Sequence, residues 1–193
     1  MNSKFSCEKL GIDGVKFITP FYLEDDRGYF LKSVEKDIFA EWGMEVKIYE
    51  TFETYSKKGV IRGLHFQTKD PQAKIVRAIK GEIRDVIVDL RKDSETFGKH
   101  LVVELSDINH NILWIPQGFA HGFEVISDDA LVSYTCVGKY LNEYDTGIVW
   151  NDATLGIEWK TVSPIVSEKD KSLQSFEEFC ERYGGLAQDE KGE

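Results

Sequence analysis

The sequence predicts an all-β protein built from many short strands in a barrel or sandwich, with a few short peripheral helices. Three observations lead to this prediction. Runs of β-branched and aromatic residues alternate with polar residues over four to nine positions. Glycine, proline and aspartate separate these runs at intervals of roughly 10–20 residues, as turns do in sandwiches and barrels. Helical periodicity is confined to two segments.

The expected strands follow one another along most of the chain. The alternation over residues 59–67 places Arg62 and Leu64 on one face and Gly63 and His65 on the other. Turn residues such as Lys80-Gly81 and Pro116-Gln117-Gly118 interrupt the runs. The clearest expected strands cover residues 46–49, 74–79, 83–90, 100–105, 111–115 and 131–137.

Two helices are expected, one over residues 35–42 and one over residues 168–183. In the second, Leu173, Phe176, Phe179 and Cys180 fall on one face. The polar residues 184–193 are expected to form a frayed tail. A length of 193 residues fits a single domain, and no internal repeat or linker divides it.

The composition bounds the possible partners and the compartment. A net charge of −10 and a pI near 5.0 argue against broad electrostatic binding to nucleic acid or to an anionic membrane. Cys7, Cys136 and Cys180 form no CxxC pair, which favours a reducing cytoplasm over a disulfide framework. No apolar run is long enough for a signal peptide or a membrane-spanning helix. We therefore expect a cytoplasmic protein without membrane or nucleic-acid partners.

Two of the four histidines lie in segments that suggest chemistry. His121 belongs to a Pro-x-Gly-x-x-His pattern that resembles the second motif of cupin barrels. Metal-binding cupins add an upstream His-x-His pair, but Gln67 stands two positions after His65. We therefore expect a barrel without a metal site, which leaves His65 free to act as a base. Taken alone, His65 could equally be a core histidine satisfied by a hydrogen bond.

Proton transfer without a metal needs a base, a group that orients it, an acid on the opposite side, and a cation for the developing negative charge. Asp170 could orient an imidazole, although it could also be an ordinary acidic residue at a helix N-terminus. Tyr134 and Tyr140 could each supply a phenol. Lys74 opens a β-branched run and could point inward, although most lysines lie on the surface.

Together, six segments resemble the dTDP-4-dehydrorhamnose 3,5-epimerase family, and the similarity runs from about residue 12 to about residue 175. The resemblance implies a cupin-like jelly roll that needs no cofactor. It also implies a homodimer in which N-terminal strands, at about residues 12–50, are exchanged between partners. The six segments are residues 26–30, 59–67, 74–77 with 80–86, 113–123, 134–140 and 150–152.

The resemblance also implies a role for each of four catalytic residues. His65 corresponds to the general base, and Asp170 to the carboxylate that pairs with it. Tyr134 corresponds to the general acid, and Lys74 to the cation near the C4 oxygen of the substrate. The implied reaction is epimerisation of a nucleotide-linked 4-keto-6-deoxy sugar at C3, at C5 or at both, through an enolate.

Further residues are expected to bind the nucleotide sugar. Arg62 resembles a residue near the diphosphate, and Arg27 resembles a nucleotide contact that reaches across the dimer. His121 resembles a second histidine of the pocket. The full set of expected substrate-binding residues is Arg27, Phe30, Lys32, Glu50, Phe52, Arg62, His121 and Tyr140.

Two departures from the family pattern concern these binding residues. Lys32 stands where the family commonly has glutamate, and Glu50-Thr51-Phe52 replaces a usual Gln-x-Asn. A reversed charge changes which groups of a nucleotide can be bonded, so CDP or GDP is open as the carrier beside dTDP. Other open alternatives are a 4-keto sugar isomerase, a non-catalytic sugar-nucleotide binding cupin and a metal-dependent cupin enzyme.

Overall fold

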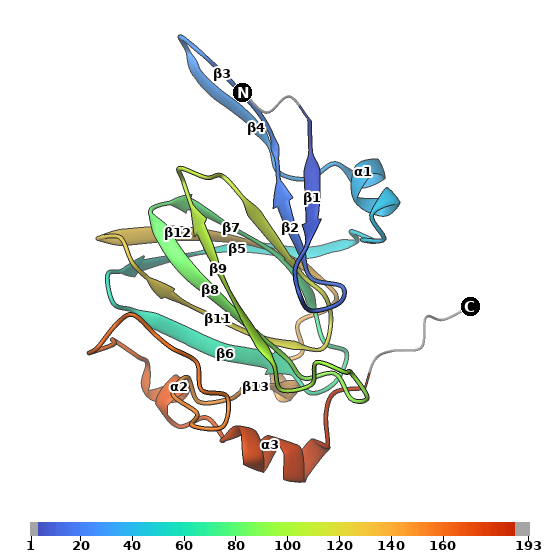
Figure 1. Ribbon diagram of the computed structural model, residues 1–193, viewed down its shortest axis with the longest axis vertical. Coiled ribbons are helices and arrows are strands. Elements are labelled where there is room, and N and C mark those ends of the chain that lie inside the picture. Colours follow the sequence, from blue (N-terminus) through green and yellow to red (C-terminus); the bar gives the residue numbers. More distant parts are fainter. Residues whose placement is uncertain (1–3, 188–193) are drawn as a thin grey trace.

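The computed structural model describes residues 4–187, and its body is formed by two antiparallel sheets that face each other (Figure 1). One sheet has six strands in the order β1-β2-β10-β7-β12-β5, and the other has five in the order β13-β6-β11-β8-β9. The prediction of an all-β jelly roll with a few short helices is confirmed. The strands are β1 (Ser6–Lys9), β2 (Lys16–Thr19), β3 (Phe21–Asp25), β4 (Gly28–Lys32), β5 (Ile48–Lys57), β6 (Ile61–Gln67), β7 (Ala73–Lys80), β8 (Glu82–Asp89), β9 (His100–Ser106), β10 (Ile112–Ile115), β11 (Phe119–Val125), β12 (Asp129–Val137) and β13 (Asp145–Gly147).

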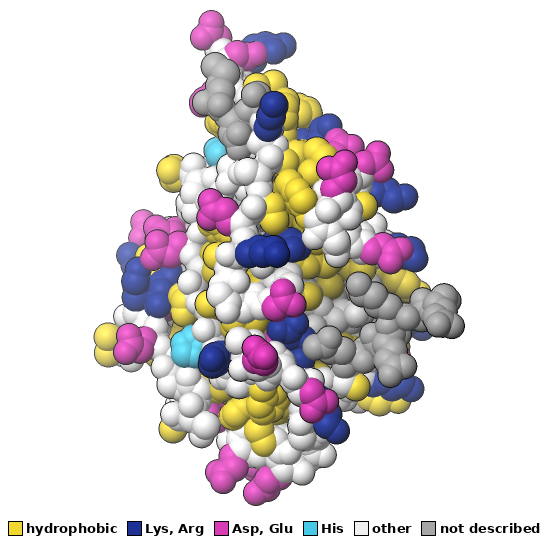
Figure 2. Space-filling view, turned by 45° about the vertical axis from the view of Figure 1, so that its right-hand side comes forward, with side chains coloured by type: hydrophobic (Ala, Val, Ile, Leu, Met, Phe, Trp, Pro, Cys, Tyr) yellow, Lys and Arg dark blue, Asp and Glu magenta, His cyan; other side chains and the backbone are white. Residues whose placement is uncertain are grey.

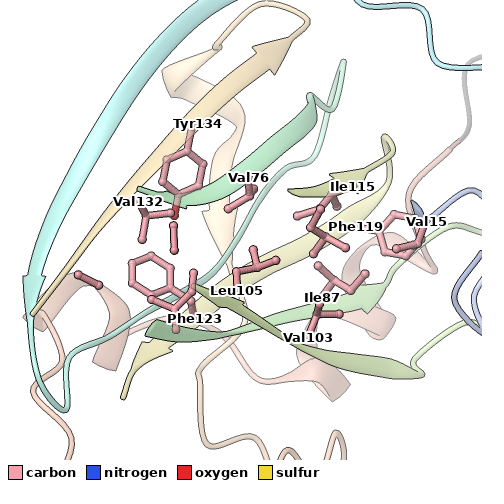
Figure 3. Packing of buried hydrophobic residues seen from close by; sticks show 14 of the residues in the cluster. Val15, Val76, Ile87, Val103, Leu105, Ile115, Phe119, Phe123, Val132 and Tyr134 are labelled. Atoms are coloured by element: carbon pink, nitrogen blue, oxygen red, sulfur yellow. The ribbon is translucent and has the colours of Figure 1, made fainter. Parts of the chain in front are cut away.

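The space between the two sheets is filled by alternate residues of both. Val76 and Leu113 come from the six-stranded sheet, and Ile87 and Phe123 come from the five-stranded sheet. Each of these four side chains is at most 1% exposed, so their burial drives the sheets together. Figure 3 shows how the side chains of this cluster interdigitate. One part of the same interior stays open and holds the candidate site.

The outer faces of the sheets are covered by short helices. The helix α1 (Lys36–Glu41) confirms the first predicted helix, and its Phe39 packs with Met44 against Ile75 on the outer face of the six-stranded sheet. The helix α3 (Phe176–Tyr183) lies over the five-stranded sheet, where Phe179 packs against Phe66 (Figure 1). None of the helices among residues 4–187 is long and apolar enough to cross a membrane.

The prediction of one continuous helix over residues 168–183 is wrong. This segment is divided into α2 (Glu168–Lys171) and α3, because Ser175 caps the N-terminus of α3 and forms a capping box with Glu178. The expected frayed tail also begins later than residue 184. Leu186 is buried, and its N–H donates a hydrogen bond to the carbonyl of Leu90 at 2.7 Å. Residues 188–193 of that expected tail lie outside the described residues.

The strands β3 and β4 form a hairpin that projects from the body (Figure 1). Within residues 4–187 these two strands pair only with each other. Leu23, Tyr29 and Phe30 on the hairpin are 39%, 54% and 57% exposed. On the face shown in Figure 2, hydrophobic side chains also reach the surface in the upper part of the molecule, where the hairpin leaves the body. The hairpin therefore offers apolar surface that the rest of its own chain leaves uncovered.

Candidate active site

A cavity of 160 Å³ opens between the two sheets and is lined by both of them. The six-stranded sheet contributes residues of β5, β7 and β12, and the five-stranded sheet contributes residues of β6 and β11. Three of the four predicted catalytic residues line it directly. Its lining residues are Phe52, Thr54, Arg62, His65, Lys74, His121, Gly122, Phe123 and Tyr134.

His65 on β6 pairs with the fourth predicted catalytic residue, Asp170. The distance from His65 Nε2 to Asp170 Oδ1 is 2.7 Å, and the other carboxylate oxygen accepts the N–H of Gly63 at 3.1 Å. Asp170 is held at the start of α2, where its own N–H donates to the Ser167 hydroxyl. Burial raises the pKa of Asp170. The hydrogen bond and charge of His65, together with the hydrogen bond from the Gly63 N–H, lower the pKa by a larger amount, so it lies below its ordinary value.

Arg62 lines the same cavity as His65, so the prediction that they lie on opposite faces of their strand is wrong. The reason is an irregularity in the pairing of β6 with β11. His65 lies opposite His121 and Arg62 lies opposite Phe123, so four residues of β6 face three of β11. Such a bulge interrupts the alternation of faces. The Arg62 Nε donates to the Ser56 hydroxyl at 2.9 Å.

Tyr134 on β12 enters the cavity from the opposite sheet. Figure 3 shows its phenol pointing into the interior, toward Phe123. Phe52 of the neighbouring strand stacks on the phenol, with ring centroids 4.7 Å apart and planes at 15°. Burial and the negative charge of Asp85 raise the pKa of Tyr134, whereas Thr54 and Arg62 lower it. The phenol therefore keeps its proton in the free protein and can act as an acid.

Lys74 on β7 lines the cavity and, like Arg62, brings a positive charge to it. It also lines an adjoining cavity of 20 Å³ together with Gln72 and Asp145. Burial lowers the pKa of Lys74, and nearby acidic groups that include Asp145 and Glu50 oppose this effect. The predicted binding residue Glu50 does not line the 160 Å³ cavity, and its Oε1 accepts a hydrogen bond from Gln72 Nε2 at 3.0 Å.

His121 is the second histidine of the cavity, and the sequence did not reveal its partner. Its Nε2 lies 2.8 Å from Oδ2 of Asp85 on β8, and both side chains are buried. A signal for Asp85 was present, because the alternation of β8 places it on the interior face with Ile83 and Ile87. A carboxylate at an inward position of an apolar strand normally requires a partner.

The remaining predicted binding residues lie away from the cavity. Arg27 sits in the turn of the β3–β4 hairpin with its side chain 90% exposed, and it pairs with Asp25 at 2.5 Å. Phe30 and Lys32 lie on β4, where Lys32 pairs with Glu35 at 2.6 Å. Tyr140 follows β12, and its hydroxyl donates to Asn142 at 3.4 Å. One chain therefore does not bring these four residues to the cavity.

The cavity combines a histidine of the five-stranded sheet, paired with a carboxylate of α2, with a phenol and an ammonium group of the six-stranded sheet. This arrangement can remove a proton from one side of a bound molecule and return a proton to the other side. Among residues 4–187, no cluster of three or more His, Cys, Asp or Glu side chains could hold a metal ion.

Comparisons with known sequences agree with the predicted resemblance. The family model described as dTDP-4-dehydrorhamnose 3,5-epimerase matches residues 9–178. The chain is 45% identical to the dTDP-4-dehydrorhamnose 3,5-epimerase of Methanothermobacter thermautotrophicus over 179 residues, which cover 91% of this chain and 97% of the relative. It is also 38% identical to a dTDP-4-dehydrorhamnose 3-epimerase of Streptomyces niveus, over 84% of this chain and 79% of the relative.

A solved structure gives the same result for the fold. The chain matches a dTDP-6-deoxy-D-glucose-3,5-epimerase from Legionella pneumophila, in complex with dTDP-4-keto-L-rhamnose, with a TM-score of 0.91 and 34% identity. The match covers 96% of this chain and all of the other. The sequence and fold comparisons thus agree with the residues that line the cavity.

Proposed function

Because this chain belongs to the dTDP-4-dehydrorhamnose 3,5-epimerase family, we propose that His65 and Tyr134 exchange protons with a 4-keto sugar bound between them. The protein is an isomerase that epimerises a nucleotide-linked 4-keto-6-deoxy sugar. The observation that supports the proposed roles most directly is that His65, which is paired with Asp170, and Tyr134 line one cavity from opposite sheets.

The substrate class explains why these residue types are suitable. In a 4-keto sugar, C3 and C5 are both next to the carbonyl carbon, so loss of a proton from either carbon gives an enolate with its charge on the C4 oxygen. Lys74 would hold that oxygen in the protein interior, where such a contact is worth about 10²- to 10³-fold in rate. The ketone of the substrate itself provides the activation of the C–H bond.

His65 takes the proton in this proposal. Its Nε2 donates a hydrogen bond to Asp170, which leaves the lone pair on Nδ1 as the base. The pair that forms after proton transfer is an imidazolium next to a carboxylate, so Asp170 stabilises the charge that His65 gains. His65 is 32% exposed on its side chain, which gives it a route for proton exchange with water.

Tyr134 returns a proton to the opposite side of the same carbon. The C–H bond that forms takes the phenol proton, the enolate C4 oxygen becomes a carbonyl again, and Tyr134 is left as a phenolate. The configuration at that carbon is inverted because base and acid come from different sheets. Exchange of one proton each with water restores His65 and Tyr134.

The proposal is tested by incubating the protein in deuterium oxide with dTDP-, CDP- and GDP-linked 4-keto-6-deoxy sugars. Nuclear magnetic resonance then shows which carbons incorporate deuterium and which invert. Incorporation with inversion at C3, C5 or both is expected for at least one carrier. The three carriers are compared because Lys32 on β4 stands where the family commonly has glutamate, which leaves the carrier nucleotide open. Binding of a nucleotide sugar without any incorporation would identify a non-catalytic cupin instead.

We further propose that two chains form a dimer in which the β3–β4 hairpin of each completes the site of the other. The hairpin projects from its own body, exposes Tyr29 and Phe30, and carries Arg27 at its turn (Figure 1). Placed against a second copy, these residues and Lys32 would line the nucleotide end of the partner's cavity. The free state of Cys7, Cys136 and Cys180 favours the proposed location in the cytoplasm.

Complementation tests this arrangement. Arg27→Ala and His65→Ala are each expected to lose activity when purified alone. After unfolding and refolding together, mixed dimers contain one site with an intact hairpin and an intact base, so activity should return. If the two variants recover no activity after refolding together, or if light scattering shows that the protein is a monomer, the exchanged dimer is rejected.

A further inference from the structure

The residue of the cavity that carries a further inference is Thr54 on β5. Its hydroxyl oxygen is buried and makes no hydrogen bond to any of residues 4–187. Leaving a hydroxyl buried and unpaired destabilises the folded protein, so its retention needs an explanation. A partner that forms only during the reaction would supply one.

The sheet register places Thr54 next to the acid of the site. Tyr134 lies opposite Phe52 and Val132 lies opposite Thr54, so Thr54 is the diagonal neighbour of Tyr134 on the same interior face. Both side chains line the 160 Å³ cavity. Phe52 covers the flat face of the phenol, and Thr54 follows two residues later on the same strand.

The charges around Tyr134 show what a hydroxyl at this position would do. Transfer of the phenol proton to the sugar leaves a phenolate in a buried position, and Asp85 adds a negative charge nearby. Burial and Asp85 both raise the pKa of Tyr134, and Thr54 acts in the opposite direction by lowering it. A hydroxyl that donates to the phenolate oxygen has this effect because it stabilises the charged form.

We propose that Thr54 is a positioning residue for Tyr134. The Thr54 hydroxyl donates a hydrogen bond to the phenolate oxygen that forms when Tyr134 delivers its proton. The inference rests on the proposed function and adds a residue to it. No covalent bond to Thr54 forms or breaks, and its hydroxyl proton stays on Thr54. Once Tyr134 regains a proton from water, the phenolate and its hydrogen bond with Thr54 are gone.

The inference separates two measurable steps. Proton removal by His65 does not use the phenol, so deuterium can enter the substrate with retained configuration even when Tyr134 delivers its proton slowly. Inversion requires Tyr134 and therefore depends on Thr54. A loss of the Thr54 hydroxyl should raise the ratio of exchange to inversion, which general damage to the cavity would not do.

The experiment compares Thr54→Val, Thr54→Ser and the wild type in deuterium oxide on the nucleotide sugar that the wild type uses best. Thr54→Val keeps the shape of the side chain and is expected to slow inversion about 10- to 100-fold, the size expected for a lost hydrogen bond to a charged group. Exchange should fall several-fold less, and Thr54→Ser should restore inversion. Thr51→Val, on the same strand with its side chain exposed, is the matched control and should behave as the wild type.

The outcomes distinguish this inference from the function on which it rests. Wild-type inversion rates in Thr54→Val would overturn the role of Thr54, and so would an equal loss of exchange and inversion. A wild type that neither exchanges nor inverts any of the three carriers would reject the proposed function together with the role of Thr54. Thermal unfolding of each variant confirms that the compared proteins are folded.

Discussion

Two histidine–carboxylate pairs lie side by side in this protein, and they differ in what surrounds them. His65 and His121 face each other on β6 and β11, and each places Nε2 within 2.7 or 2.8 Å of an aspartate. The side chain of His65 is 32% exposed, whereas that of His121 is 4% exposed. The same pair of residue types can therefore serve proton exchange in one place and the shape of the cavity in the other.

The carboxylates differ as well. Asp170 uses both oxygens, one toward His65 and one toward the N–H of Gly63. Asp85 uses Oδ2 for His121, and its buried Oδ1 has no partner among residues 4–187. A fully bonded carboxylate holds its histidine in one orientation, while a buried and partly bonded one depends on its histidine for its only compensation.

The largest expected difference concerns activity. His65→Ala should abolish deuterium uptake into the 4-keto sugar, with a loss of about 10²- to 10⁴-fold in kcat because the base is removed. His121→Ala should lower kcat/KM about tenfold while uptake remains measurable, since a contact of the pocket is lost but the base stays. His100→Ala, on β9, serves as the control. Equal losses from the two cavity variants would remove the distinction between the pairs.

Asp170→Asn tests whether His65 needs a negatively charged partner. An amide in place of the carboxylate can stabilise the wrong tautomer and cannot compensate an imidazolium, so kcat should fall about 10²- to 10⁴-fold, with little change in KM. Steady-state kinetics at saturating substrate measures this. Asp85→Asn should reduce kcat much less, and a larger loss there would assign proton transfer to the His121 pair.

Stability should show the reverse order. His121→Ala leaves the carboxylate of Asp85 buried without its partner, so the free energy of unfolding should fall by about 3 kcal/mol. His65→Ala should cost less, because Asp170 keeps the Gly63 N–H and remains at its helix terminus. Urea denaturation at neutral pH measures both. A greater loss in His65→Ala would mean that the catalytic pair also holds the fold together.

The smallest expected effect is a pH dependence. The pKa of Asp170 is lowered in the folded protein, so its contribution to stability is present above the unfolded value of about 3.9 and is lost as the pH falls through the lower folded value. The difference in stability between wild type and Asp170→Asn should be constant near neutrality and shrink in acid. Asp89→Asn should show the same trend, since Arg91 lowers the pKa of that carboxyl. A difference that grows in acid would contradict the assigned direction.

Much of this comparison was predictable from the sequence. The strands from β7 to β10 and β12 were expected because their alternation is regular and turns bound them. The positions of His65, Tyr134 and Lys74 in one cavity followed from the family resemblance. The Asp170 pairing followed in the same way, although Asp170 and His65 are separated by 105 positions.

The parts that were missed depend on geometry that no local pattern encodes. The face of Arg62 was wrong because the pairing of β6 with β11 contains an irregularity, and the alternation rule assumes a regular strand. The break between α2 and α3 depends on the cap at Ser175, which a hydrophobic periodicity does not register. The partnership of Asp85 with His121 and the unpaired Thr54 hydroxyl required the register of neighbouring strands.

The distance of Asp170 from His65 along the chain has a consequence for how the protein is made. During translation the strands that carry His65, Lys74 and Tyr134 leave the ribosome before α2, which carries Asp170. The helix α3, which follows α2, also supplies Phe176 and Phe179 to the hydrophobic cluster that contains Phe66 of β6. An interrupted chain would therefore lack both the carboxylate that pairs with His65 and part of the core.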